Sequence, residues 1–116
     1  MKSRKLEEMS ALQLRKGLNN ETVAILIFGA CENHGDHLPF GSDVFVPMEL
    51  AKRLAVRAKN VLVLPPFPYG VSSHHSDFQM TLTWRPTTMI SYCRPFMWFV
   101  SIYNGWKIRI LTLFLQ

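Results

Sequence analysis

Three residues in the first half of the chain carry side chains that divalent metals bind in proteins. Glu32 and His34 are two positions apart, so in extended backbone both side chains point to one face. Asp43 follows after a turn marked by Gly35 and Gly41. Two carboxylates and an imidazole suit a divalent cation such as zinc or manganese. The same residue types also gather in solvated loops and salt-bridged clusters, so the spacing alone leaves both interpretations open.

The secondary structure expected around residues 32–43 predicts where this polar segment lies in the fold. Directly before it, the apolar and β-branched run Val23–Phe28 is typical of a buried strand. Open α/β sheets bind ligands at the carboxyl ends of their strands, which is where this polar segment begins. A helix is expected from residue 42 or 43 to about 58, because apolar residues recur at helical spacing. A second strand over 61–64 would complete a right-handed parallel crossover.

Shorter elements are expected on either side of this unit. Residues 6–18 are predicted to form one short amphipathic helix, with Ser10 as an internal cap. Pro47 is acceptable in the helix after the motif because we expect it near the first turn, where few N–H groups have helical partners. Residues 81–84 are predicted to form a short strand at the rim of the sheet.

The last part of the chain predicts a helix and a strand, with one local conflict. The helix is expected over residues 87–103, capped by Thr87 or Thr88, and the strand over 107–115. Pro95 falls in the interior of this helix. It should kink or break the helix at a cost of about 3 kcal/mol.

Two sequence blocks resemble one known family. Residues 32–43 read Glu-Asn-His-Gly-Asp-His-Leu-Pro-Phe-Gly-Ser-Asp. This run resembles the Glu-x-His-Gly-x-His-Leu-Pro-x-Gly-(Thr/Ser)-Asp signature of the creatininase (creatinine amidohydrolase) family. Residues 61–75 are similar to the family's segment of a strand, Pro-Pro, Tyr-Gly and Ser-x-x-His. The blocks come in the family's order, and the resemblance covers roughly residues 5–90.

The resemblance implies a fold and a chemistry. The fold is α/β, a three-layer arrangement around a parallel sheet, with residues 1–116 as a single creatininase-like domain. The chemistry is that of a metal-dependent amidohydrolase with two divalent cations, zinc or manganese. Glu32 would hold one cation, His34 the other, and Asp43 would bridge them. Water activated by the cations would attack the C–N bond of an amide or cyclic amide.

The sequence also departs from the family pattern. The family's remaining ligands, a His and a Glu, lie in or after an Asn-Gly-His-Gly-Gly-Asn loop, and the chain ends at Gln116 about where that loop should begin. Gln79 and Met80 stand where the family has Pro-Gly. We therefore expect a domain incomplete at its C-terminal end, with impaired hydrolysis. The alternative is a non-catalytic remnant or interaction module of the same fold.

Two further histidines, His74 and His75, are candidate catalytic residues. The resemblance implies that one of them lines the substrate pocket and transfers a proton, and it leaves open which one. Alternatively, they are a pair of polar histidines at the rim. Ser72 and Ser73 are interpreted as turn residues, because no Gly-x-Ser-x-Gly motif surrounds them.

Composition narrows the classes of partner. The chain has 116 residues, of which 48% are hydrophobic, as in globular domains. The net charge of +5 is spread over several segments. Because no basic run is interleaved with aromatic residues, we expect no nucleic-acid partner. No apolar stretch reaches the roughly 20 residues of a membrane-spanning helix, so no membrane partner is expected either.

Two remaining expectations concern location and assembly. Cys31 and Cys93 show neither metal-type spacing nor a disulfide framework, and we interpret them as reduced thiols of a cytoplasmic protein. The resemblance implies a small-molecule amide substrate and assembly into a homo-oligomer.

Overall fold

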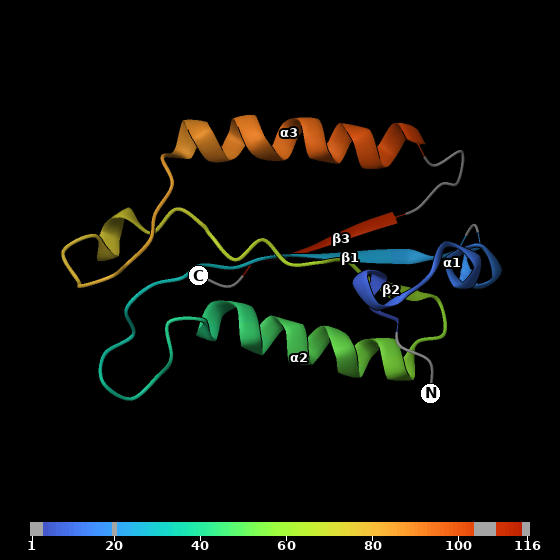
Figure 1. The fold of residues 1–116 in the computed structure, drawn as a ribbon, viewed down its shortest axis with the longest axis horizontal. Coiled ribbons are helices and arrows are strands. Elements are labelled where there is room, and N and C mark those ends of the chain that lie inside the picture. Colours follow the sequence, from blue (N-terminus) through green and yellow to red (C-terminus); the bar gives the residue numbers. More distant parts are fainter. Residues whose placement is uncertain (1–3, 20, 104–108, 115–116) are drawn as a thin grey trace.

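A parallel three-stranded sheet forms the middle layer of the molecule (Figure 1). The computed structural model describes residues 4–19, 21–103 and 109–114, with side chains as far as residue 94. The strand order is β2-β1-β3. Their bounds are β1, Val23–Phe28; β2, Val61–Val63; and β3, Arg109–Phe114. Val23 pairs with Val61 on one side and with Arg109 on the other.

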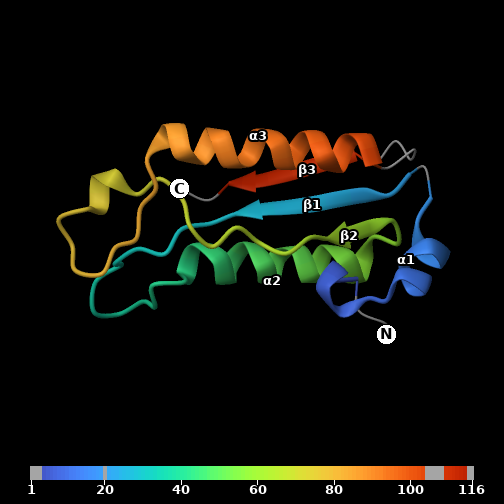
Figure 2. The ribbon, with the colours of Figure 1, turned by 45° about the horizontal axis from the view of Figure 1, so that its top comes forward.

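Helices cover both faces of this sheet. Helix α2, Ser42–Arg57, lies on one face, and α3, Pro86–Tyr103, lies on the other (Figures 1 and 2). The short helix α1, Ala11–Gly17, lies near the start of β1 (Figure 2). None of the helices within the described ranges is long and apolar enough to cross a membrane. The α/β, three-layer fold expected from the sequence is confirmed.

Strand β1 is the centre of two hydrophobic clusters. Ile25 and Ile27 point toward α2, where they pack with Val63 and with the small residues Ala51 and Ala55. The alternate residues of β1, which are Ala24, Leu26 and Phe28, point to the opposite face. They pack with β2 and with residues of α1 and α3. Because both faces are covered, β1 is an unbroken apolar run, as central parallel strands usually are.

The strands and α2 lie close to their expected positions, but the amino-terminal helix does not. The expectation of a single helix over residues 6–18 is wrong. The structure has a 3₁₀ turn, Leu6–Glu8, and then α1 from Ala11. Ser10 is extended and caps α1: its Oγ accepts a hydrogen bond from Gln13 N, and its N donates to Gln13 Oε1. This capping box fixes the start of the helix at residue 11.

The structure also bears on two expectations about prolines. Pro47 is the sixth residue of α2 rather than part of its first turn, and it is fully buried. Helix α3 begins at Pro86, before the expected Thr87 cap, and it continues across Pro95 to Tyr103. Proline suits the first helical position because its fixed φ is helical and no N–H bond is lost there. A proline in the interior of a helix removes one N–H donor. Nevertheless, α2 does not break at Pro47, and α3 does not break at Pro95.

The strand expected over 81–84 is reduced to a single bridge. Leu82 N donates to Cys31 O at 2.9 Å, and the two residues form an isolated antiparallel bridge. The expected last strand is present as β3, while residues 107, 108 and 115 lie outside the described residues. The segment around Leu82 is therefore a loop tied to the polar segment after β1.

Two glycines allow the loops at the carboxyl edge of the sheet to touch. A Cβ on Gly29 would lie 2.5 Å from Val44 Cγ2 and 2.9 Å from Asp43 O, at the start of α2. A Cβ on Gly70 would lie 2.6 Å from Gly29 O. These contacts bring three chain segments together where β1 ends, including the first turn of α2 that carries Asp43.

The Gly70 contact gives a first prediction. Gly70→Ala should lower the free energy of unfolding by about 1–3 kcal/mol, since the added methyl group meets backbone that cannot move aside. Gly17→Ala is the control, because its Cβ would meet nothing nearer than Arg4 Nη1 at 4.0 Å. Urea denaturation of both variants measures the difference. Equal stability of the two would contradict the close approach.

Met80 has a left-handed backbone at an exposed position. Its φ is +59°, and its side chain is 74% exposed, so no packing offsets the strain. The family resemblance expects a glycine here. Such a conformation costs an ordinary residue about 1–2 kcal/mol.

Met80→Gly should therefore raise the free energy of unfolding by up to about 1 kcal/mol, because relief of strain exceeds the added entropy of the unfolded chain. Gln79→Gly, at a neighbour whose φ is not positive, should instead lower it. Thermal denaturation compares the two variants with the parent chain. A lower unfolding temperature for Met80→Gly would contradict this assignment.

Candidate metal centre

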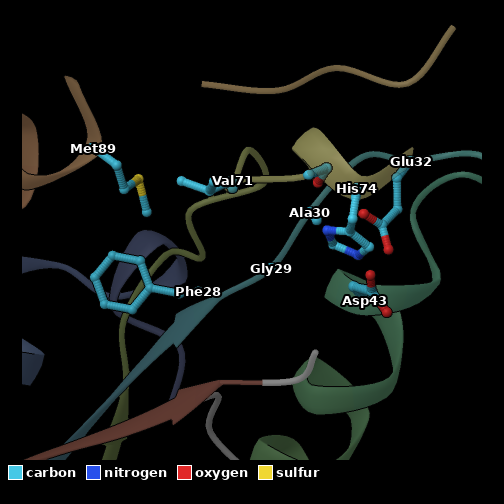
Figure 3. Close-up of a pocket in the computed structure, with 10 residues that line it drawn as sticks. Phe28, Gly29, Ala30, Glu32, Asp43, Val71, His74 and Met89 are labelled. Carbon is cyan, nitrogen blue, oxygen red and sulfur yellow. The ribbon is translucent and has the colours of Figure 1, made fainter. Parts of the chain in front are cut away.

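The three candidate ligands of the first motif meet beyond the carboxyl end of β1. Glu32 and His34 lie in the loop after β1, and Asp43 lies in the first turn of α2. One ligand atom from each residue can be chosen so that all three lie within 4.8 Å of one another. Figure 3 shows the carboxylates of Glu32 and Asp43 directed toward each other. The structure therefore brings together the residues that the spacing had singled out.

Glu32 is a largely buried carboxylate. The residue is 7% exposed, and its backbone N donates to Phe40 O at 3.2 Å. Burial alone would raise the pKa of the Glu32 carboxyl, but the Ser72 hydroxyl, the carboxyl of Asp43 and two histidines outweigh it, so the pKa is lowered. The carboxyl is thus held in the ionised form that binds cations.

His34 is oriented by a backbone carbonyl. Its Nδ1 lies 2.9 Å from Glu32 O, which can only accept, so Nδ1 carries a proton. In the neutral ring the lone pair is then on Nε2, which lies 3.3 Å from Asp43 Oδ1. A lone pair facing a carboxylate is unfavourable unless a proton or a metal ion lies between them. The carbonyl of Glu32, and Asp43 less strongly, raise the pKa of His34.

This arrangement fits a metal ligand. A histidine that binds metal usually donates its other N–H to a carbonyl or carboxylate, which fixes the ring and its tautomer. His34 has such a bond to the carbonyl of Glu32. Asp43, with its side chain 20% exposed, lies at the amino terminus of α2, where the helix dipole stabilises its negative charge.

His74 and His75 lie on a 3₁₀ turn, Ser73–His75, that also approaches Glu32. One ligand atom from each histidine and one from Glu32 also lie within 4.8 Å of one another. Glu32 is common to both groups, whereas the family resemblance implied Asp43 as the shared ligand. His75 Nδ1 lies 3.6 Å from Glu32 Oε1, which is too long for a hydrogen bond.

A cavity of about 150 Å³ opens beside these residues. Glu32, Asp43 and His74 line one end, and Phe28 and Met89 line the other (Figure 3). The polar end offers ligands for a cation, and the apolar end offers a surface for part of a small molecule.

Sequence reasoning missed the structural role of Ser72 and Asn33. Ser72 is fully buried beside Glu32, and its N donates to Thr83 Oγ1 at 2.8 Å. Asn33 N donates to Thr81 Oγ1 at 3.0 Å, and its side-chain amide donates to Gln79 O. These bonds join the two motif loops across more than forty positions of sequence. In the sequence, only the polar residues around 72 and 81–83 could have indicated these bonds.

Comparison with known proteins agrees with this fold. The family model described as creatinine amidohydrolase matches residues 7–100. The chain is 30% identical over 87 residues to 3-dehydro-scyllo-inosose hydrolase of Thermotoga maritima, an alignment that covers 74% of this chain and 28% of that protein.

Solved structures show the same fold. A mutant creatininase complexed with creatine matches with a TM-score of 0.85 and 24% identity, over 97% of this chain and 45% of that one. A creatininase structure named for manganese matches with a TM-score of 0.86 and 24% identity, over 97% of this chain and 45% of that one. A Zn-Zn type mutant creatininase gives 0.86 and 23%, over 98% and 45%. The chain thus spans less than half the length of these relatives, and it belongs to the creatininase family.

Proposed function

We propose that the chain carries the first part of a creatininase-like, metal-dependent amidohydrolase site. The observation that supports it most strongly is the pairing of His34 Nε2 with Asp43 Oδ1, because the bond from His34 Nδ1 to the carbonyl of Glu32 leaves Nε2 facing a carboxylate, where it binds either a proton or a metal ion. A divalent cation held by Glu32, His34 and Asp43 would take the place of that proton. Zinc and manganese both accept such a nitrogen and oxygen ligand set.

The side chains around the cavity would have different roles in the proposed hydrolysis. A divalent cation supplies Lewis acidity, which polarises an amide carbonyl and lowers the pKa of water to about 7. Glu32 and Asp43 supply negative charge, and the carbonyl of Glu32 keeps the His34 ring in one tautomer. Phe28 and Met89 exclude water from the apolar end of the cavity. A proton transfer by His74 or His75 stays a prediction.

The substrate class follows from the same site. A cavity of about 150 Å³ suits a small molecule whose carbonyl reaches the polar end. One of the similar structures holds creatine, and one relative is named for the hydrolysis of 3-dehydro-scyllo-inosose. We infer a small amide or cyclic amide substrate, with hydrolysis of a C–N bond as the reaction. The creatininase with creatine supports the C–N bond, whereas an inosose has no nitrogen and supports only a small carbonyl compound.

Replacement of one ligand tests the site directly. Asp43→Asn should weaken binding of Zn²⁺ or Mn²⁺ by at least about tenfold, because the amide carries no charge. Asp36→Asn, in the exposed part of the same loop, should leave the affinity unchanged. Isothermal titration calorimetry of each variant measures the effect. Equal affinities for the parent chain and Asp43→Asn would show that Asp43 is not a ligand.

Hydrolysis separates this function from the alternative of an interaction module. With added Zn²⁺ or Mn²⁺, the chain would be assayed by mass spectrometry against creatinine, N-formyl amines, short peptides and 3-dehydro-scyllo-inosose. Metal-dependent hydrolysis that Asp43→Asn abolishes supports the enzyme. Tight metal binding without turnover of any compound favours a binding role for the fold.

One surface favours association between copies of the chain. Val46, Leu50 and Leu54 recur every four residues along the outside of α2, and they are 61%, 50% and 38% exposed. Such an apolar row is typical of an interface. We propose that it mediates assembly of the chain into a homo-oligomer.

Leu50→Lys should shift the sedimentation of the chain toward the monomer, because the row then carries a buried charge in the assembly. Lys52→Ala, also on the exposed surface of α2, should sediment like the parent. An unchanged oligomer in Leu50→Lys would place the interface elsewhere.

A further inference from the structure

The cavity beside Glu32 has an apolar end that the candidate metal ligands do not occupy. Its volume is about 150 Å³, and its lining includes Phe28, Val71 and Met89. Figure 3 shows Phe28 and Met89 at one side of the cavity and the polar side chains, Glu32 among them, at the other. Because one space reaches both sets of side chains, a molecule whose carbonyl lies at the polar end extends its remaining atoms toward Phe28 and Met89.

Phe28 forms a rigid wall of this apolar end. It is the last residue of β1, it is 7% exposed, and it forms an isolated parallel bridge with Phe67. The two rings are stacked, with their centroids 4.8 Å apart and an angle of 10° between their planes. Gly29 N donates to Phe67 O at 2.8 Å beside the rings. The sheet and this stacking therefore fix the Phe28 ring.

Backbone closes another side of the cavity. Gly29 and Gly70 both line it, and a Cβ on Gly70 would lie 2.6 Å from Gly29 O and 3.5 Å from Ala30 Cβ. The two segments are in contact, and neither glycine carries a side chain that could move out of the space. This side of the cavity cannot adjust to ligands of different size.

Met89 forms the adaptable wall. It lies near the start of α3, and its side chain packs, partly buried, against the cluster that contains Phe28. A methionine side chain is unbranched and has three rotatable bonds, so it fills irregular space readily. The helix is held at this point, because the Tyr92 ring packs edge-to-face on Phe67 and on Trp84, with centroid distances of 5.3 Å and 5.2 Å. The side chain of Met89 can therefore move while its backbone stays in place.

The volume and the lining limit what this end can hold. An apolar cavity of about 150 Å³ accommodates a group the size of benzene. The polar end must take the carbonyl, so the apolar end has room for an aliphatic chain of about five carbons. A charged group would lose its hydration there, and the side chains of Phe28, Val71 and Met89 offer it no strong hydrogen-bond partner.

We propose that Phe28, Val71 and Met89 form a specificity pocket for an aliphatic group attached to the carbonyl of the substrate, and that Met89 sets the longest chain accepted. The proposal rests on the proposed function for the position of the carbonyl. It narrows the substrate to an amide with an uncharged, aliphatic substituent.

Methyl NMR of the full chain tests the pocket without any metal. The sequence contains six methionines, so ¹³C-methyl labelling gives six signals, and Met89→Leu identifies the signal of Met89. The probes are acetamide, butyramide, hexanamide and octanamide, each added in the presence of a chelator. The Met89 signal should shift, and the affinity should rise about fourfold for each added CH₂ as far as hexanamide. Octanamide should bind more weakly than hexanamide, because its chain exceeds the space.

A variant of the adaptable wall tests the role of Met89. Met89→Ala should move the preferred probe to octanamide, because the shorter side chain leaves room for about two more carbons. Ile90→Ala is the control, since Ile90 is the next residue of α3, is 55% exposed and does not line the cavity. It should keep the preference for hexanamide. Ligand-observed NMR compares the affinities of the four amides for each folded variant.

The outcomes separate this pocket from the proposed function. No shift of the Met89 signal with any amide would overturn the pocket and leave the proposed function standing, because the metal affinity of Asp43→Asn tests the latter. Affinity that still rises at octanamide in the parent chain, or a preference for hexanamide retained by Met89→Ala, would overturn the length limit set by Met89. A shift of Met89 together with equal metal affinities of the parent chain and Asp43→Asn would overturn the substrate assignment, since no cation would then hold the carbonyl.

Discussion

The close approach of two carboxyl groups is the constraint on which the rest of this site depends. Glu32 is almost buried, and Asp43 faces it from the first turn of α2. When both groups are ionised, the burial of Glu32 makes their repulsion stronger than at the surface. The described side chains supply imidazoles rather than lysine or arginine as partners. A bound cation would offset this charge and occupy Nε2 of His34 together, which supports the proposed metal site.

The fold creates this constraint by close backbone packing at one edge of the sheet. Gly29 admits the start of α2, and Gly70 admits the second motif loop against Gly29 O. The bond from Leu82 N to Cys31 O and the bonds of Asn33 hold that loop in place. The core below it is formed by both faces of β1. The loop after β1 and the first turn of α2 thus hold the two carboxylates, and the turn Ser73–His75 brings in two of the histidines.

Much of the fold could be predicted from the sequence, because β1 and α2 carry strong hydrophobic periodicity. Elements governed by one local contact were not predictable in the same way. The capping box of Ser10 divides the first helix, and a single bridge at Leu82 replaces the expected strand. In the site, spacing two residues apart was enough to place Glu32 and His34 together. The approach of His75 to Glu32 depends on tertiary packing between distant loops, so no local pattern reveals it.

The most direct test of a metal at Glu32, His34 and Asp43 is zinc K-edge X-ray absorption of the purified chain loaded with one equivalent of Zn²⁺. The account predicts a first shell of nitrogen and oxygen atoms at about 2.0–2.2 Å, with an imidazole contribution and no sulfur. Cys31 lies next to Glu32 in the sequence and is a free thiol. A sulfur neighbour at about 2.3 Å, or a shell of water alone, would contradict the central claim.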